Sequence, residues 1–262
     1  MQLDFQRSRT TGYYGFRNLF HRGASYLGSR DGLVLIGLPR EVRLWIRPIA
    51  SDTDPAHLVF YEKEYEMDDL TGCVVVDIGA GSGDSAIYFA SRGASKVYAY
   101  EPSPESFKLA QRNIAENKLG GVVKIFNEGV SDFEGIGSLK WKPGEPWSGR
   151  ITKDQGGVQV TSIAKVLKGK VDLLKLDCEG CEFGILRAME KMQLFRFVDS
   201  IILEYEANPS VLIRRLRNAG YELSIDTPRR GIIQARCQEE AFSSMQKPER
   251  SFLILLALLL FD

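Results

Sequence analysis

Histidine and excess charge are scarce in this sequence. Only two of its 262 residues are histidines, His21 and His57, so acid–base or metal chemistry in the C-terminal two-thirds must use carboxylates, cysteines or lysines. The 34 Lys and Arg residues balance 34 Asp and Glu residues. No global field therefore attracts nucleic acid or an anionic membrane, although a local basic patch is compatible with this balance.

Cysteines and long apolar runs are also few. The four cysteines, and a start (MQLDFQRSRTTGYYGF) without the apolar core of a signal peptide, favour a reducing, intracellular setting and predict a cytoplasmic protein. The run FLILLALLLF at 252–261 has ten apolar residues, whereas a membrane-spanning helix needs roughly 20. We expect a buried strand or a short helix there.

Short apolar runs alternate with segments of helical period from residue 73 onward. This rhythm predicts an α/β fold, in which a mostly parallel sheet carries helices on both faces. The expected strands are 73–79, 96–102, 122–129, 171–177 and 198–206, and the expected helices are 85–93, 104–118, 161–169, 182–192 and 209–220. Residues 221–226 and 231–237 are expected to close the sheet as an antiparallel hairpin.

The alternation of strands and helices is absent from three segments, and two of them mark the expected domain boundaries. We predict an N-terminal extension over 1–65 with a β-hairpin formed by 33–38 and 42–48, one main domain over 66–237, and a tail over 238–262. Inside the main domain, 131–160 is rich in Gly, Pro and Trp and predicts a hairpin or an irregular insertion on the rim of the sheet.

The segment VVVDIGAGSGDSA (74–86) reads as strand, glycine turn and helix. Glycines let a ligand press against the backbone at the carboxyl ends of the strands. A dinucleotide fingerprint is disfavoured because Asp84 stands where a pyrophosphate would approach the helix. Asp77 suits a cationic or hydroxylated ligand, and Glu101, 22 residues after Gly79, is placed to accept both hydroxyls of a ribose. S-adenosylmethionine has these features and no phosphate.

The pattern D-x-G-x-G-x-G at 77–83, followed by Glu101-Pro102, resembles the cofactor motifs of class I S-adenosylmethionine-dependent methyltransferases. Four segments, at 74–90, 97–117, 127–132 and 171–186, are together similar to the FkbM-type methyltransferase family. The resemblance implies a class I, Rossmann-like fold with a mostly parallel seven-stranded sheet. It also implies S-adenosylmethionine as cofactor and methyl transfer to an oxygen of sugars, polyketides or related metabolites.

The resemblance further assigns cofactor-binding residues. The turn would line the methionine half, the end of the second strand would hold the ribose, and the residues after the third strand would border the adenine. The full set predicted to bind the cofactor is Asp77, Gly79, Ala80, Gly81, Ser82, Gly83, Glu101, Pro102, Ser103, Glu128, Gly129, Val130 and Glu66. Glu66 enters because the Tyr65-Glu66 pair resembles a recurring family position.

Three carboxylates are expected to serve the chemistry. Methyl transfer from a sulfonium is an in-line displacement, and a hydroxyl acceptor must also lose its proton. Asp177 at the mouth of the fourth strand is the predicted general base, with Glu179 and Glu204 on the same rim. The family often has Glu followed shortly by His where this chain has Glu204-Tyr205-Glu206, which puts imidazole-assisted proton transfer in doubt. The carboxylates could alternatively hold a divalent cation.

Alternatives to a metabolite O-methyltransferase stay open. The chain lacks an [N/D]-P-P-[Y/F] loop after the fourth strand, which disfavours base N-methylation. An RNA (tRNA) methyltransferase is the second hypothesis, because basic clusters at 214–217 and 228–230 could touch phosphates, although a solvated face explains them as well. An NAD-dependent dehydrogenase is disfavoured by Asp84, and a non-catalytic S-adenosylmethionine-binding module is compatible with the motifs.

The stretch LLKLDCEGCEFG (173–184) holds a Cys-x-x-Cys pair, Cys178 and Cys181, among acids. The resemblance favours packing for both cysteines, since Cys178 stands where the family usually has an apolar residue, while a redox motif is the alternative. Aromatic residues on the rim and in the N-terminal region are expected to frame the acceptor pocket. These are Trp141, Trp147, Tyr13, Tyr14 and Trp45.

Overall fold

The computed structural model describes residues 12–48, 50–67, 69–142, 145–205, 208–225 and 231–238. The predicted tail, 238–262, lies outside these residues except for its first position, as does the cluster at 228–230. None of the helices in these ranges is long and apolar enough to cross a membrane.

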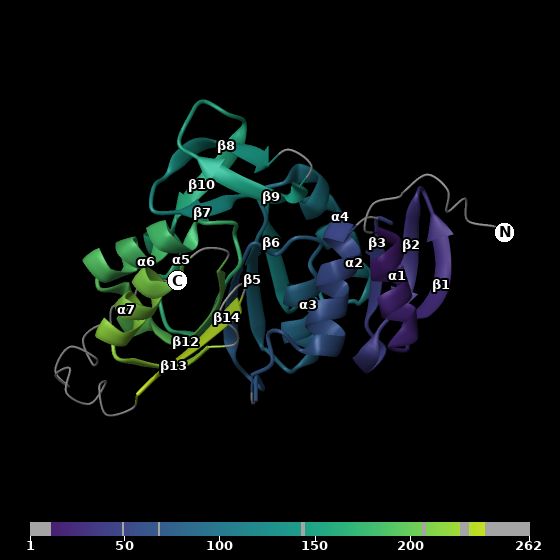
Figure 1. The fold of residues 1–262 in the computed structure, drawn as a ribbon, viewed down its shortest axis with the longest axis horizontal. Helices are drawn as coiled ribbons and strands as arrows, with labels where there is room; N and C mark the ends of the chain where they lie inside the picture. Colours follow the sequence, from purple (N-terminus) through teal and green to yellow (C-terminus); the bar gives the residue numbers. More distant parts are fainter. Residues whose placement is uncertain are drawn as a thin grey trace.

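A seven-stranded sheet forms the centre of the fold, in the order β13-β14-β12-β11-β4-β5-β6 (Figure 1). Its parallel strands are β4 (Val74–Ile78), β5 (Lys96–Tyr100), β6 (Val123–Phe126), β11 (Val171–Leu176) and β12 (Val198–Tyr205). The strands β13 (Tyr221–Ile225) and β14 (Gly231–Cys237) form the antiparallel hairpin at one edge. The predicted fold class and the closing hairpin are therefore confirmed.

Helices cover both faces of this sheet because neighbouring strand residues point to opposite sides. On β4, Val75 belongs to one core cluster and Val76 to the other. The first cluster includes α3 (Asp84–Ser91) and one side of α4 (Pro104–Glu116), and the second includes α5 (Ile163–Val166), α6 (Glu182–Lys191) and α7 (Ser210–Asn218). The continuous apolar runs of the sequence thus become strands buried on both faces.

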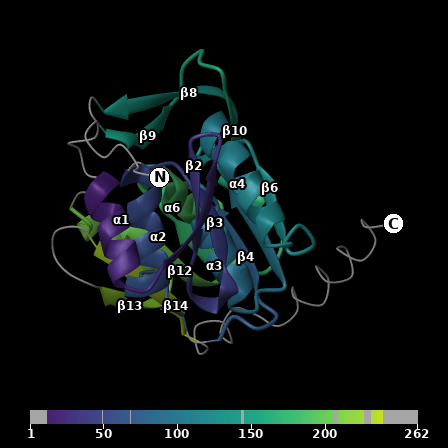
Figure 2. The same cartoon turned by 90° about the vertical axis from the view of Figure 1, so that its right-hand side faces the viewer.

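The N-terminal region contains more structure than the expected hairpin. The strands β2 (Leu33–Gly37) and β3 (Arg43–Ile46) pair antiparallel as predicted, and β1 (Ser25–Arg30) adds a third strand. Two helices, α1 (Gly12–His21) and α2 (Ala50–His57), accompany this sheet, and a π-helical turn at Leu58–Glu62 continues α2 (Figure 2). Leu19, Ile36 and Ile46 are fully buried in the same cluster as α3, so this region completes one face of the main core.

The insertion after β6 folds into a small sheet above the carboxyl ends of the central strands (Figure 1). Its order is β7-β10-β8-β9, with β7 (Gly129–Ser131), β8 (Gly135–Lys142), β9 (Glu145–Thr152) and β10 (Val158–Ser162). The strands β8 and β9 form the expected hairpin, and β10 ties it to β7 through a parallel pairing. Two short 3-10 turns, at Pro39–Glu41 and Leu194–Phe197, complete the secondary structure of the described residues.

Candidate active site

The glycine turn after β4 brings three parallel strands together. The backbone N–H groups of Gly79 and Ala80 both donate to the carbonyl oxygen of Tyr100 at the end of β5, at 3.0 and 3.1 Å. Gly79 has a φ of +81°, and a side chain there would clash with the carbonyl oxygen of Asp177, which follows β11. Only glycine combines this backbone angle with this close approach. The turn is therefore fixed by the central sheet.

A cavity of about 920 Å³ opens over this turn, at the carboxyl ends of β4, β5, β11 and β12. Its volume lies within the range of small-molecule and cofactor sites. Residues of the turn, the end of β5, the β7–β10 sheet, α2 and the loop after β11 line it. The predicted site residues in its wall are Gly79, Gly81, Ser82, Glu101, Pro102, Ser103, Gly129, Val130, Asp177, Glu179 and Glu204.

Glu101 is a buried acid of the cavity wall, with 7% of its surface exposed. Its two carboxylate oxygens accept backbone N–H groups from Gly81 at 2.9 Å and from Ser103 at 2.8 Å. Burial raises the pKa of Glu101 to about 7, while the two N–H donors and the charge of Lys175 act in the opposite direction. Each oxygen keeps a further lone pair, so this carboxylate can accept ligand hydroxyls.

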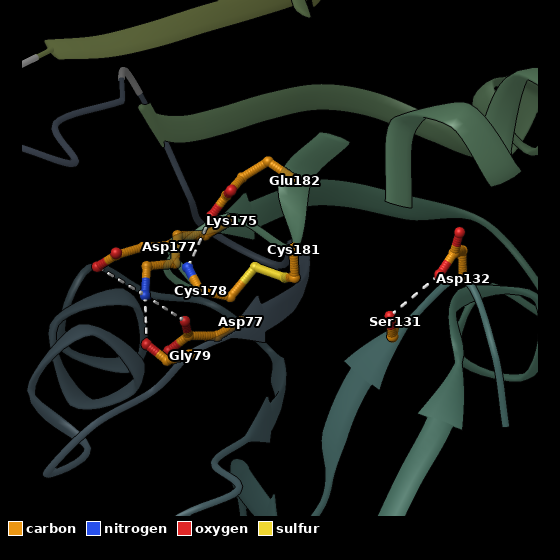
Figure 3. The surroundings of a disulfide bond; sticks show 9 residues. All are labelled: Asp77, Gly79, Ser131, Asp132, Lys175, Asp177, Cys178, Cys181 and Glu182. Atoms are coloured by element: carbon orange, nitrogen blue, oxygen red, sulfur yellow. Dashed lines mark hydrogen bonds and ion pairs between the residues drawn. A yellow bond between two sulfur atoms is a disulfide. The ribbon is translucent and has the colours of Figure 1, made fainter. Parts of the chain in front are cut away.

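Asp77 lies one layer deeper and is fully buried. The Ser85 hydroxyl donates to Asp77 Oδ2 at 2.7 Å, and Lys175 Nζ lies 3.1 Å from Asp77 Oδ1. Lys175 Nζ also donates to the carbonyl oxygen of Gly79 at 2.6 Å and lies 3.6 Å from Asp177 Oδ2 (Figure 3). Burial alone would lower the pKa of Lys175, but the carboxylates around it, Asp77 first, raise it above its ordinary value. The lysine therefore stays charged and links β4 to β11.

Asp177, the predicted general base, stands where β11 ends and reaches the cavity. The Tyr65 hydroxyl donates to Asp177 Oδ2 at 2.8 Å, and the side chain of Asp177 is 28% exposed. Burial, followed by the charge of Asp177, raises the pKa of Tyr65 well above its ordinary value, so the phenol remains a donor. Glu179 and Glu204 line the same cavity, so the three predicted carboxylates do converge.

Several predicted binding residues take other places. Glu66 is exposed, pairs with Lys63 at 3.0 Å and does not line the cavity, whereas the hydroxyl of Tyr65 beside it donates to Asp177. Asp77, Ala80, Gly83 and Glu128 also lie outside the cavity wall. Gly83 is instead packed against α4, because a Cβ there would lie 3.1 Å from the Cβ of Ala110. Asp77, Ala80 and Gly83 therefore belong to β4 and the turn after it without forming the surface of the cavity, and Glu128 lies between β6 and β7.

The reading of Cys178 and Cys181 as packing thiols is wrong, because the two cysteines form a disulfide with a Cα–Cα distance of 5.5 Å (Figure 3). The physical reason is the turn between them. Glu179 and Gly180 both have positive φ angles, 57° and 101°, and this brings the ends of the four-residue loop together. Because the pair is oxidised, the two cysteines also give no support to a reducing setting. Cys73 and Cys237 are free.

Two site residues, Lys175 and Arg47, have no role in the sequence-based predictions, and Tyr65 enters them only as the neighbour of Glu66. A charge inside the apolar strand LLKL was a usable signal for Lys175, since a buried lysine needs acidic partners. The Arg47 guanidinium donates two hydrogen bonds, of 2.9 and 2.7 Å, to the buried Asp52 of α2, and both residues line the cavity. No local sequence motif indicates that α2 lines the cavity, because this contact arises from tertiary packing.

The aromatic frame expected around the acceptor is only partly described. Trp45 does not line the cavity; its ring lies under the Arg112 guanidinium at 3.9 Å and its indole N–H donates to Glu116 at 3.0 Å, so it fastens β3 to α4. The side chains of the other four aromatic residues, Tyr13, Tyr14, Trp141 and Trp147, lie outside the described part of the chain. The basic cluster at 214–217 sits on α7, where Arg215 pairs with Glu190 of α6.

Sheet order, glycine turn and buried strand-end acid together define a class I methyltransferase. The FkbM methyltransferase domain matches residues 77–223, more than half of the chain, and the chain belongs to this family. Members of this family use S-adenosylmethionine. The cavity fits that cofactor, since the backbone at Gly81 is open to it and Glu101 offers buried oxygens that can accept hydroxyls.

Known proteins with related sequences are also methyltransferases. The chain is 25% identical over 186 residues to methyltransferase sdnD of Sordaria araneosa, covering 56% of this chain and 71% of that protein. It is 21% identical over 203 residues to methyltransferase 1 of Beauveria bassiana, covering 65% and 81%. A shorter match, 50% identical over 54 residues, links 21% of the chain to 18% of the ribosomal protein L11 methyltransferase of Carboxydothermus hydrogenoformans.

Among solved structures, the chain resembles an FkbM methyltransferase from Methylobacillus flagellatus with a TM-score of 0.47 and 14% identity. The likeness covers 69% of this chain and about half, 48%, of that one. The fold assignment rests on the strand order and the family match rather than on this likeness.

Proposed function

We propose that the chain is an S-adenosylmethionine-dependent O-methyltransferase that acts on a hydroxyl of a sugar, a glycolipid or a small metabolite. The observation that carries the proposal is the placement of Asp177. Its carboxylate faces the same cavity as Glu101, is fixed by the Tyr65 hydroxyl and stands beside the charged Lys175. A fixed carboxylate at this point can accept the proton of an acceptor hydroxyl.

Each residue then has a defined task. Glu101 would accept the ribose hydroxyls of the cofactor, and the open backbone at Gly81 would admit its methionine half. The cofactor supplies an electrophilic methyl group on a sulfonium. Asp177 would orient the acceptor hydroxyl and take its proton, while Tyr65 and Lys175 hold the carboxylate in place. Most of the rate would come from this positioning.

Glu179 and Glu204 would act on the acceptor side. Both line the cavity near Asp177, and carboxylates bind sugar hydroxyls well because each oxygen accepts two hydrogen bonds. Glu128 and Val130, predicted to border the adenine, lie next to Gly129 at the start of β7, and only Val130 and Gly129 reach the wall. The adenine would therefore lie against the short stretch around Gly129.

The charge of the cavity wall argues against RNA as the acceptor. Of the described residues in the wall, Arg47 is the only basic one, and it is bound to Asp52. The acids there include Asp54, Glu101 and Glu105 in addition to those near Asp177. A phosphate backbone would meet a wall of like charge, whereas RNA-binding grooves present cations.

Labelled methyl transfer tests the proposal. The purified protein is incubated with methyl-labelled S-adenosylmethionine and, separately, with hydroxylated sugars, glycolipids, small metabolites and tRNA. We expect label in a hydroxylated small molecule or glycolipid. Label in tRNA alone would contradict the acceptor class, and binding of the cofactor without transfer to any acceptor would favour a non-catalytic module.

Asp177→Asn tests the predicted base in the same assay. We expect turnover to fall by about 10²- to 10⁴-fold, the usual contribution of a positioned base, with the affinity for S-adenosylmethionine unchanged. Glu204→Gln is the comparison variant, since it removes a charge from the same wall on the neighbouring strand; we expect it to weaken acceptor binding and to lower turnover far less than Asp177→Asn. Turnover that survives in Asp177→Asn and is lost in Glu204→Gln would reassign the base to Glu204.

A further inference from the structure

The Cys178–Cys181 disulfide lies in the wall of the cavity rather than in a remote loop. Cys178 lines the cavity between the two carboxylates Asp177 and Glu179. Both cysteines pack against the second core cluster, but of the two only Cys178 lines the cavity. Molecules that enter the cavity therefore meet Cys178 rather than Cys181.

The sulfur of Cys181 belongs to the residue at the start of a helix. Cys181 immediately precedes α6, and the ten-residue helix directs its unpaired N–H groups toward this position. A thiolate is stabilised at such a place, because the N-terminus of a helix carries a partial positive charge. When the disulfide opens, Cys181 is thus the better leaving group.

A buried acid completes the arrangement. Glu182 is 3% exposed and accepts the N–H of Cys178 at 2.9 Å, and one of its carboxylate oxygens lies within 4.8 Å of both sulfur atoms (Figure 3). Burial raises the pKa of Glu182 to about 7. Near neutral pH the carboxyl can therefore either give up or receive a proton beside the departing sulfur.

We propose that the Cys178–Cys181 pair is a reversible thiol–disulfide exchange site, with a dithiol as its reductant and Glu182 as its proton donor and acceptor. A thiolate of the reductant attacks the sulfur of Cys178, which forms a mixed disulfide and releases Cys181 as a thiolate. Glu182 protonates Cys181. Glu182, now a carboxylate, takes the proton of the reductant's second thiol, and the thiolate so formed attacks the reductant sulfur in the mixed disulfide. The reductant leaves as a disulfide, and Cys178 leaves as a thiolate that takes up from water the proton released earlier by the reductant's first thiol. Two electrons and two protons thus pass from the dithiol to the cysteine pair.

The exchange would also regulate methyl transfer, a part of the inference that rests on the proposed function. A disulfide holds its sulfurs at about 2.0 Å, whereas two thiols separate to about 3.5 Å or more. Cys178 lies in the wall beside the predicted base and Cys181 does not, so a change in the separation of the two sulfurs alters the wall at Cys178. Reduction would therefore loosen the acceptor side of the cavity and leave the Glu101 side unchanged.

A thiol titration tests the exchange site without any use of methyl transfer. The full chain carrying Cys73→Ser and Cys237→Ser, so that only the pair remains, is equilibrated in graded ratios of reduced and oxidised dithiothreitol, and its thiols are trapped with a maleimide and weighed by mass spectrometry. We expect both thiols to appear together in one reversible two-electron transition. A pair that stays oxidised, or stays reduced, at every ratio would overturn the proposal.

Glu182→Gln tests the proton donor, since the amide keeps an oxygen that can accept the N–H of Cys178. We expect its disulfide to be reduced by dithiothreitol at neutral pH about tenfold more slowly, because a positioned acid is lost. Equal reduction rates in the two proteins would remove Glu182 from the proposal.

The regulatory part is tested by turnover and by S-adenosylmethionine binding, each measured in both oxidation states. We expect reduction to lower turnover at least about threefold, since loosened positioning slows transfer, with cofactor affinity unchanged. The Cys178→Ser/Cys181→Ser variant should lose this response to redox buffer. Equal turnover in the two states would overturn the regulation alone. Absence of cofactor binding in both states would instead overturn the proposed function and leave the titration result standing.

Discussion

The two sides of the cavity differ in how firmly they are built. On the proposed cofactor side, Glu101 is buried and both of its oxygens are bonded to backbone N–H groups, and the glycine turn is fixed to the neighbouring strands. On the proposed acceptor side, the wall comes from α2, the strands β8 to β10 and the loop closed by Cys178 and Cys181. The first side depends on the central sheet, and the second on additions to it. A chemistry shared by many proteins can therefore sit beside an acceptor site that is particular to this one.

The largest effect is expected on the cofactor side. Gly79→Ala would place a methyl group against the carbonyl oxygen of Asp177 and force a left-handed backbone on alanine. We expect loss of S-adenosylmethionine binding together with a large loss of folded protein, measured by calorimetric titration and thermal unfolding. Gly72→Ala is the matched control, because Gly72 has a similar φ of +78° with no atom within 4 Å of an added Cβ. It should cost only about 1–2 kcal/mol. Equal losses of folded protein and of cofactor binding in both variants would show that the close approach of Gly79 to the Asp177 carbonyl oxygen has no effect.

A second large effect is expected where the two sides meet. Lys175→Met removes the buried cation between Asp77 and Asp177 and leaves their charges without compensation. Breaking a buried ion pair in this way costs about 3–5 kcal/mol, measured as the free energy of unfolding in urea. Lys170→Met is the control, since Lys170 pairs with Asp199 at the surface, and its loss should cost less than about 1 kcal/mol. A Lys175→Met protein as stable as the control would refute the role given to this lysine.

A smaller effect is expected on the acceptor side. Arg47→Ala leaves the buried Asp52 without its two guanidinium hydrogen bonds and should lower the free energy of unfolding by about 1–3 kcal/mol. The affinity for S-adenosylmethionine should not change, because Arg47 does not contact Glu101 or the glycine turn by hydrogen bond. Arg47→Lys keeps the charge but loses the two-pronged geometry, and should show an intermediate loss. If the Arg47 variants lost affinity for S-adenosylmethionine as well as stability, the cofactor side and the acceptor side of the cavity would not be independent.

The difference between the two sides of the cavity also explains which features could be predicted from the sequence. The buried strands, their parallel order, the closing hairpin and the convergence of Glu101 and Asp177 all follow from local patterns, because strand-end residues of a parallel sheet must share one edge. Lys175 was missed although its position inside LLKL carried a signal. Arg47 belongs to a segment whose contact with the cavity depends on how the N-terminal region packs, and no short pattern encodes that packing. The Tyr65-Glu66 pair was marked by its family resemblance, but the role was given to Glu66 rather than to Tyr65.

The oxidation state of the cysteine pair and the direction of some side chains could not be predicted from the sequence either. A Cys-x-x-Cys spacing is compatible with packing, metal binding and a disulfide, and the choice for Cys178 and Cys181 depends on the left-handed turn at Glu179 and Gly180. Glu66 was predicted from its place beside Tyr65 and Trp45 from its aromatic ring in the N-terminal region, but their side chains point to the surface and to α4. Residue type and proximity in sequence do not determine which way a side chain faces.

The most direct test of the account is a calorimetric titration of the wild-type chain and of Glu101→Gln with S-adenosylmethionine, with Glu204→Gln as the control from the opposite wall. Hydrogen bonds to a charged group contribute about 1.5–3 kcal/mol, so we expect saturable binding by the wild type and an affinity about 10- to 100-fold weaker in Glu101→Gln. Thermal unfolding of each variant checks that it is folded. Affinity should be unchanged in Glu204→Gln. No binding by the folded wild type, or equal affinity in all three proteins, would contradict the assignment of this cavity to the cofactor.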